Sequence, residues 1–92
     1  MKTTSLLTAS AVHIIGIGGS GASALAGILA GRGIRVSGSD QNRSSKLTLL
    51  EKAGIQTSIG HRAEHIPKEA QCVVYSLAID KANPELQESR NR

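Results

Sequence analysis

The fold is decided by the stretch from Val12 to Gly31, which reads VHIIGIGGSGASALAGILAG. Its first part, up to Ile17, is rich in β-branched residues and predicts a strand that is covered on both faces. Behind it the apolar residues change to the spacing of one helix face, at Ala22, Leu25, Ala26 and Leu29. The stretch therefore predicts a buried strand, a glycine-rich turn and a helix.

The turn carries the pattern G-x-G-x-x-G, with one additional glycine inside it. Glycines at these places permit a tight turn, a close approach of the backbone to a ligand, and close packing of the helix on the strand. Such a loop directs amide N–H groups and the positive end of the helix dipole at its ligand, for which a phosphate or diphosphate is suited. The predicted phosphate-binding residues are Gly16, Gly18, Gly19, Ser20 and Gly21. Because the pattern alone is weak, a turn with a purely structural role is the alternative.

The rest of the chain repeats this unit. A junction of helix, glycine, isoleucine and strand occurs at Gly33-Ile34 and again at Gly54-Ile55. Further strands are expected over 34–38, 56–59 and 71–76. A second helix is expected after the possible N-caps Asn42, Ser44 and Ser45, and a short helical turn over 63–66. A last helix is expected from Pro84, with Asn83 as its N-cap.

Two successive junctions of this kind indicate right-handed β-α-β crossovers, and hence parallel strands. The fold class is α/β, a Rossmann-like three-layer domain with a mainly parallel sheet of about four to five strands. We expect residues 1–10 to be a flexible leader and residues 11–92 to form the domain.

Composition excludes several classes of protein. Ninety-two residues with one Tyr and no Trp or Phe make one small domain with an aliphatic core. The net charge of +4 comes from dispersed basic residues without aromatic stacking platforms, so no nucleic-acid partner is expected. No Asp, Glu, Lys or Arg lies between Thr3 and Gly31, but His13 and the many glycines, serines and threonines there argue against a membrane span. The single cysteine, Cys72, is expected to be a buried thiol in a reducing compartment, with no metal site.

Ligands of such sheets bind where the carboxyl ends of the strands meet. Asp40 lies 19 positions after Gly21, close to the spacing at which an acid accepts hydrogen bonds from a ribose, although a turn or cap role is the alternative. His61 is a candidate for contact with a base, with plain exposure as its alternative. His13 is expected to be a hydrogen-bonded core residue and His65 a surface residue.

The motifs taken together resemble a known family. HIIGIGGSG at 13–21, VSGSD at 36–40, IGH at 59–61 and NPE at 83–85 follow the order and spacing of the Mur ligases of peptidoglycan synthesis, and especially of the ligases that add L-alanine to UDP-N-acetylmuramate. The resemblance covers the chain from Val12 onward. Two positions depart from it, because Ala22 stands where the family usually has methionine and Leu77 where it usually has a second serine.

The resemblance implies an N-terminal domain that holds the UDP part of UDP-N-acetylmuramate. The diphosphate would lie on the glycine loop, and the remaining substrate-binding residues would be Ser39, Asp40, His61 and Ser76. ATP and Mg²⁺ would bind a central domain in cis, and a C-terminal domain would help to bind the amino acid. The 92 residues would contain no catalytic residue and no cofactor site, since their glycine loop lacks the Lys-Thr or Lys-Ser of an ATP-binding loop.

Three alternatives remain open at this point. An NAD(P)-binding domain of an oxidoreductase shares the glycine pattern and the acid, although the chain supplies little more than one mononucleotide-binding half. The related murein-tripeptide recycling ligase uses the same UDP sugar, but the continuous loop from Gly18 to Gly21 favours the alanine-adding ligase. A partner-binding module with an empty pocket is the third. For a Mur ligase we expect a cytoplasmic location.

Overall fold

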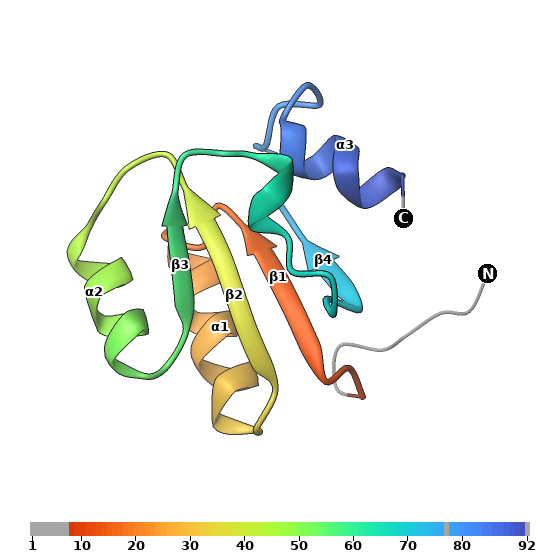
Figure 1. The fold of residues 1–92 in the computed structure, drawn as a ribbon. Helices are drawn as coiled ribbons and strands as arrows, with labels where there is room; N and C mark the ends of the chain where they lie inside the picture. Colours follow the sequence, from red (N-terminus) through yellow and green to blue (C-terminus); the bar gives the residue numbers. More distant parts are fainter. Residues whose placement is uncertain (1–7, 77, 92) are drawn as a thin grey trace.

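The computed structural model describes residues 8–76 and 78–91. The strands are β1 (Ala11–Ile15), β2 (Arg35–Asp40), β3 (Gln56–Ile59) and β4 (Cys72–Val74). The helices are α1 (Ser20–Gly31), α2 (Ser45–Lys52), the short 3-10 helix η1 (Ala63–His65) and α3 (Pro84–Arg90). Among these residues the strands form one sheet in the order β3-β2-β1-β4, and all of its pairs are parallel (Figure 1). The predicted α/β class with a parallel sheet is confirmed.

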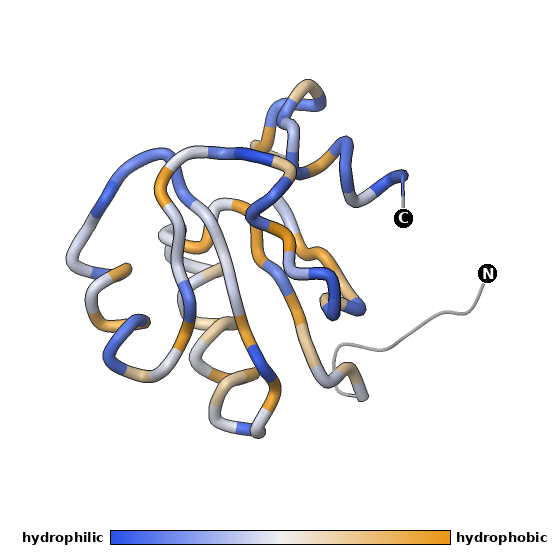
Figure 2. Tube along the Cα trace, viewed as in Figure 1, coloured by the Kyte–Doolittle hydropathy of each residue, from blue (hydrophilic) through white to orange (hydrophobic). Residues whose placement is uncertain are grey.

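The central strand β1 is buried along its whole length, as predicted. Its side chains alternate between the two faces of the sheet. Val12 and Ile14 belong to the core cluster that α1 and α2 cover, whereas His13 contacts a residue of α3 on the opposite face. Figure 2 shows the hydrophobic residues concentrated along this strand, while the loop after β2 is hydrophilic. The domain therefore has helical cover on both sides of its sheet.

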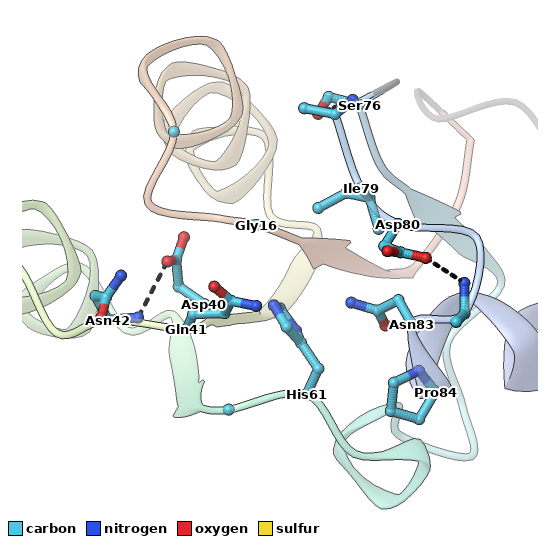
Figure 3. A pocket seen from close by; sticks show the side chains of 14 residues that line it. Gly16, Asp40, Gln41, Asn42, His61, Ser76, Ile79, Asp80, Asn83 and Pro84 are labelled. Carbon is cyan, nitrogen blue, oxygen red and sulfur yellow. Dashed lines mark hydrogen bonds between the residues drawn. The ribbon is translucent and has the colours of Figure 1, made fainter.

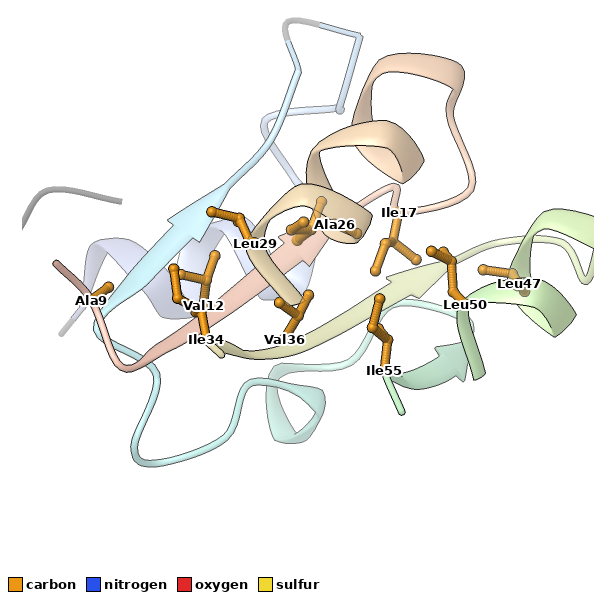
Figure 4. Packing of buried hydrophobic residues seen from close by; sticks show 11 residues of the cluster. Ala9, Val12, Ile17, Ala26, Leu29, Ile34, Val36, Leu47, Leu50 and Ile55 are labelled. Atoms are coloured by element: carbon orange, nitrogen blue, oxygen red, sulfur yellow. The ribbon is translucent and has the colours of Figure 1, made fainter. Parts of the chain in front are cut away.

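The core between the sheet and the first two helices is aliphatic (Figure 4). Its buried members are Ala9, Val12, Ile14, Ile17, Ala26, Leu29, Ile34, Val36, Leu47, Leu50 and Ile55. Ala9 falls inside the leader expected at residues 1–10, whose residues 1–7 lie outside the described part of the chain, as does Leu77. Cys72 is half-buried and packs against this core, so the expectation of a buried thiol is met in part.

Glycines with positive φ end two helices and two strands, one of them β3, which Gly60 (φ +85°) follows. Gly33 (φ +84°) and Gly54 (φ +90°) follow α1 and α2, where the sequence predicted helix stops. Gly16 (φ +80°) turns the chain out of β1, so Ile17 lies beyond the strand that was expected to include it. The amides of Gly16 and Ile17 both donate to the carbonyl of Ser39, at 2.8 and 2.9 Å. The glycine loop is thereby fastened to β2.

A buried carboxylate attaches α3 to the sheet. Glu85, in the first turn of α3, is fully buried, and its Oε1 accepts hydrogen bonds from His13 Nε2 of β1 (2.6 Å) and Ser39 Oγ of β2 (2.7 Å). Its Oε2 accepts from the amide of Arg62 (3.1 Å) and from His65 Nδ1 (3.1 Å). One side chain thus links α3 to two strands and to η1. His65, expected at the surface, is instead half-buried, because this bond draws its ring inward.

The neighbours of Glu85 decide its charge. Burial raises the pKa of the carboxyl, but hydrogen bonds from His13, Ser39 and His65, together with the charge of His13, outweigh burial and lower the pKa to about 2. Glu85 is therefore an anion at neutral pH. A buried anion of this kind is tolerated only because its oxygens are fully hydrogen-bonded.

Gly38 provides a test of the packing beneath the glycine loop. A Cβ at this position would lie 2.7 Å from Ile17 Cβ and 2.8 Å from the carbonyl oxygen of Ile14, so neither a rotamer change nor a small shift relieves both contacts. We expect Gly38→Ala to lower the free energy of unfolding by about 1–3 kcal/mol, as overpacking of a core does. Chemical denaturation measures the change.

Gly27 is the matched control. It lies on the exposed side of α1, and a Cβ there would meet nothing within 4 Å. Gly27→Ala should therefore raise the free energy of unfolding by up to about 1 kcal/mol, because alanine favours the helix more than glycine does. A Gly38→Ala protein as stable as the Gly27→Ala protein would contradict the packing described here.

The low pKa of Glu85 predicts a loss of stability in acid. Because the folded pKa (about 2) lies below the ordinary value of 4.5, the stabilisation is complete above pH 4.5 and disappears as the pH falls toward 2. A difference of this size corresponds to a contribution on the order of 3 kcal/mol. Thermal unfolding followed by circular dichroism between pH 5 and about pH 2.5 should show a falling Tm.

Glu51 supplies the control for this measurement. Its pKa is also lowered to about 2, by hydrogen bonds from Arg43 and Thr57, but this group is exposed enough that its pairing contributes little. Glu51→Gln removes that titration and should leave the fall in Tm nearly unchanged. If the Tm of the Glu51→Gln protein were constant over this range, the acid sensitivity would come from Glu51 and not from Glu85.

Candidate functional site

The loops that follow all four strands enclose one cavity of about 690 Å³ at the carboxyl edge of the sheet (Figure 3). Asp40 and Asn42 lie on one side of it, and Ser76, Ile79 and Asp80 on the other. The complete lining is Gly16, Gly19, Asp40, Gln41, Asn42, Gly60, His61, Ser76, Ala78, Ile79, Asp80, Ala82, Asn83 and Pro84. The gathering of these loops follows from the parallel sheet, as the sequence predicted.

The predicted site residues are divided among three places. Those that line the large cavity are Gly16, Gly19, Asp40, His61 and Ser76. Ser20 and Gly21 line an adjacent cavity of about 450 Å³, which shares Gly16, Gly19 and Ser76 with the first. Gly18 and Ser39 line neither of the two cavities. Most of the predicted site residues thus lie close together, but they line two adjoining cavities instead of one.

The glycine loop uses several of its own amides internally. The amide of Gly18 donates to Asp40 Oδ2 at 2.9 Å, and that of Gly19 donates to the carbonyl of Gly16 at 3.1 Å. These two amides were expected to hold a phosphate, and in this structure they already have acceptors. For Gly18 the reason is the close approach of β2, which brings the Asp40 carboxylate to the loop, and for Gly19 it is the tight turn after β1, which brings the Gly16 carbonyl within reach.

The amides that remain for an anion belong to the first turn of α1. Among the described residues, the N–H groups of Ser20, Gly21 and Ala22 have no protein acceptor, because the first hydrogen bond of the helix runs from Ser23 to the carbonyl of Gly19. No acidic residue occupies this first turn. The N-terminus of α1 therefore keeps its positive dipole end available.

A cation lies beside this helix end. Lys46, in the first turn of α2, donates from Nζ to Ser20 Oγ at 3.0 Å. Its ammonium group adds a full positive charge next to the free amides of α1. Sequence reasoning missed this residue, because only the packing of α2 against α1 brings the two helix N-termini together.

Asp40 has a structural role in this state. Its carboxylate accepts from the amide of Gly18 and, at 3.3 Å, from the amide of Asn42. The second contact is the turn role that the sequence left open as the alternative to ribose binding. Because the carboxylate also lines the large cavity, its structural role leaves it within reach of a ligand.

His61 lines the large cavity and is held from the buried side by Ser39. His61 Nδ1 lies 3.0 Å from Ser39 Oγ and 3.4 Å from Glu85 Oε2, and its side chain is 10% exposed. Ser39 itself is fully buried, so it supports His61 rather than facing a ligand. His13, on the same network, is fully buried with Ser37 and Glu85 as partners, which confirms its predicted place in the core.

Glu85 is the most important residue that sequence reasoning missed in this site. The motif NPE marks it as an acidic residue in a first helical turn, which is usually an exposed position that complements the helix dipole. The sequence feature that could have indicated a buried Glu85 is the presence of three histidines, at positions 13, 61 and 65, which can hydrogen-bond to a carboxylate. The chain has no other histidine.

Residues 8–76 and 78–91 contain no group of three or more His, Cys, Asp or Glu side chains arranged to hold a metal ion. In the same part of the chain, no helix is long and apolar enough to cross a membrane.

Comparisons with known proteins point to one family. The model of the Mur ligase family, catalytic domain, matches residues 11–92. The UDP-N-acetylmuramate--L-alanine ligase of Streptomyces coelicolor is 51% identical over 74 residues, which are 80% of this chain and 16% of that protein. The enzyme of the same name from Thermobifida fusca is 49% identical over 81 residues, 88% of this chain and 17% of that protein. The chain thus spans about a sixth of the length of these relatives.

Solved structures agree with the sequence matches. The UDP-N-acetylmuramate-alanine ligase of Thermotoga maritima superposes with a TM-score of 0.83 at 31% identity, over 87% of this chain and 18% of that one. A murein peptide ligase of Psychrobacter arcticus superposes with a TM-score of 0.78 at 29% identity, over 89% of this chain and 17% of that one. The family match covers nearly the whole chain, and on this evidence the chain belongs to the Mur ligase family.

Proposed function

We propose that this chain binds the UDP part of UDP-N-acetylmuramate, as the N-terminal domain of a ligase that adds L-alanine to that sugar nucleotide in the cytoplasm. The observation that carries the proposal is the pair of adjoining cavities at the carboxyl edge of the sheet: the residues with free N-terminal amides of α1 line the smaller one, and His61 lines the larger one. An anion-binding end and a base-binding end are what a nucleoside diphosphate requires.

The proposal gives a role to each part of the site. The diphosphate lies on the amides of Ser20 and Gly21, with the charge of Lys46 beside it. The uridine lies toward His61, and Asp40 is placed between the two ends of the ligand. This arrangement moves the expected diphosphate contact from Gly18 and Gly19 to the next two residues, whose amides have no internal acceptor.

The names of the relatives support the choice of substrate. Both sequence relatives described above are named as ligases of UDP-N-acetylmuramate with L-alanine, at about 50% identity. We propose that ATP and Mg²⁺ are bound by a central domain in cis and that the chain described here orients the donor without performing phosphoryl transfer. The recycling ligase remains the closest alternative in this family, since a murein peptide ligase is among the structural relatives.

Nucleotide titration of the 92-residue chain tests the proposal. Addition of UDP or UDP-N-acetylmuramate should shift the amide resonances of Ser20, Gly21 and the residues around His61 in ¹H–¹⁵N spectra, because these groups contact the ligand. NADH is the comparison ligand and should cause weaker shifts. Saturable shifts of the glycine loop with NADH alone would support the oxidoreductase alternative, and no shift with either ligand would support a partner-binding module.

Lys46 gives a sharper test of where the diphosphate lies. Replacing it by alanine removes a cation next to the anion site and should weaken UDP binding about 3- to 10-fold, with less effect at high salt, as expected for a partly screened charge. Isothermal titration calorimetry at two salt concentrations measures this difference.

Lys52 is the control for Lys46. It carries the same charge on the same helix, but it lies in the last turn of α2, away from the N-terminus of α1. Lys52→Ala should leave UDP affinity within about twofold of the parent chain. Equal losses for the two variants would show that only the net charge matters and would remove Lys46 from the site.

A further inference from the structure

We propose that Glu85 and Ser39 are positioning residues, which hold the His61 ring with its proton on Nδ1 and leave Nε2 as a hydrogen-bond acceptor facing the cavity. This inference rests on the proposed function, since it names how the base end of that site selects its ligand. An acceptor at this place suits a base that presents a ring N–H, as uracil does at N3.

The protons of the network can be assigned one by one. Glu85 is ionised, so both of its oxygens only accept. Ser39 has a single hydroxyl proton, and it donates that proton to Glu85 Oε1 at 2.7 Å. Toward His61 the Ser39 oxygen must therefore accept. Nδ1 of His61 has only these acceptors near it, Ser39 Oγ at 3.0 Å and Glu85 Oε2 at 3.4 Å, and so it must carry the proton.

The other ring nitrogen of His61 is directed at the ligand. Among the described residues, Nε2 has no hydrogen-bond partner, and no fully buried side-chain nitrogen or oxygen lacks one. Nε2 is therefore accessible, and the surface that His61 presents belongs to the large cavity (Figure 3). In the neutral ring with Nδ1 protonated, this atom carries a lone pair.

Glu85 is suited to this role because it contacts both the His61 ring and the backbone next to it. The oxygen that lies near His61 Nδ1 also accepts from the amide of Arg62, the next residue in the chain. The other oxygen is fixed by His13 and Ser39 on the central strands. The carboxylate cannot turn without breaking these bonds, so the His61 ring has one preferred orientation.

Ser37 offers a matched control for Ser39. Both serines lie on β2, two positions apart, and thus point to the same face of the sheet. Both are buried, and each has its hydroxyl within hydrogen-bond distance of a histidine that contacts Glu85. Ser37 contacts His13 Nδ1 at 2.8 Å and has no hydrogen bond to His61. Ser37→Ala removes the contact with His13, whereas Ser39→Ala removes one hydrogen bond to Glu85 and one to His61, so only Ser39→Ala loosens the His61 ring.

The first measurement is the tautomer of His61 in the ligand-free 92-residue chain. Long-range ¹H–¹⁵N spectra at about pH 8, where a histidine of ordinary pKa is neutral, distinguish a protonated from an unprotonated ring nitrogen. We expect a protonated Nδ1 and an unprotonated Nε2 in the parent chain and in Ser37→Ala, and a mixture of tautomers in Ser39→Ala. A proton on Nε2 in the parent chain would overturn the proposal.

The second measurement is UDP affinity. Ser39→Ala should weaken binding about 5- to 30-fold, the range of one well-oriented hydrogen bond, whereas Ser37→Ala should stay within about twofold. In a His61→Ala background, Ser39→Ala should cause no further loss of UDP affinity, because the proposal connects Ser39 to the ligand only through the His61 ring. Equal losses with and without His61, or equal losses for the two serines, would assign Ser39 a merely structural role. If the parent chain does not bind UDP, the proposed function fails, and the tautomer measurement still decides this inference.

Discussion

The structure depends on one buried anion. Glu85 is fully enclosed, and it is separated by 72 positions from His13, its partner on the central strand. An unpaired carboxylate at this place would cost several kcal/mol, so α3 can dock only where the donors of β1, β2 and η1 converge. That position in turn places Asn83 and Pro84, which precede Glu85, in the wall of the large cavity. The contacts of Glu85 that attach α3 to the sheet therefore also position the part of the cavity wall that Asn83 and Pro84 form.

The residues of strand β2 serve different functions on the two faces of the sheet. Ser37 and Ser39 point to the face of the histidines and Glu85, whereas Gly38 leaves room for Ile17 and Asp40 accepts the amide of Gly18. A shift of register by one residue would exchange the two sets and place polar hydroxyls under the glycine loop. The pairing of β1 with β2, which aligns Ile14 with Gly38 and Ile15 with Ser39, is thus a condition both for the loop and for the buried network.

Local patterns were enough to predict the elements. The change of period from strand to helix after Gly16, and the glycines at 33 and 54, place four strands and three α-helices close to their observed bounds, because these signals act over a few residues. The parallel sheet then predicts which loops meet. Two kinds of detail depend on long-range packing, and local patterns did not predict them: the inward direction of Glu85, and the use of the Gly18 amide by Asp40. His65 was placed at the surface for the same reason, since its partner lies 20 residues away.

Charge favours a placement of the proposed nucleoside diphosphate across both cavities rather than inside the larger one. The larger cavity is lined by the carboxylates of Asp40 and Asp80, which repel phosphate oxygens. The smaller cavity has no acidic lining residue and includes Ser20 and Gly21, next to Lys46. Since the two cavities share Gly16, Gly19 and Ser76, one ligand can occupy both. In the proposed complex the uncharged base lies on the acidic side, next to His61, and the diphosphate lies at the N-terminus of α1. On this arrangement Asp40 and Asp80 orient the ligand by excluding its charged end.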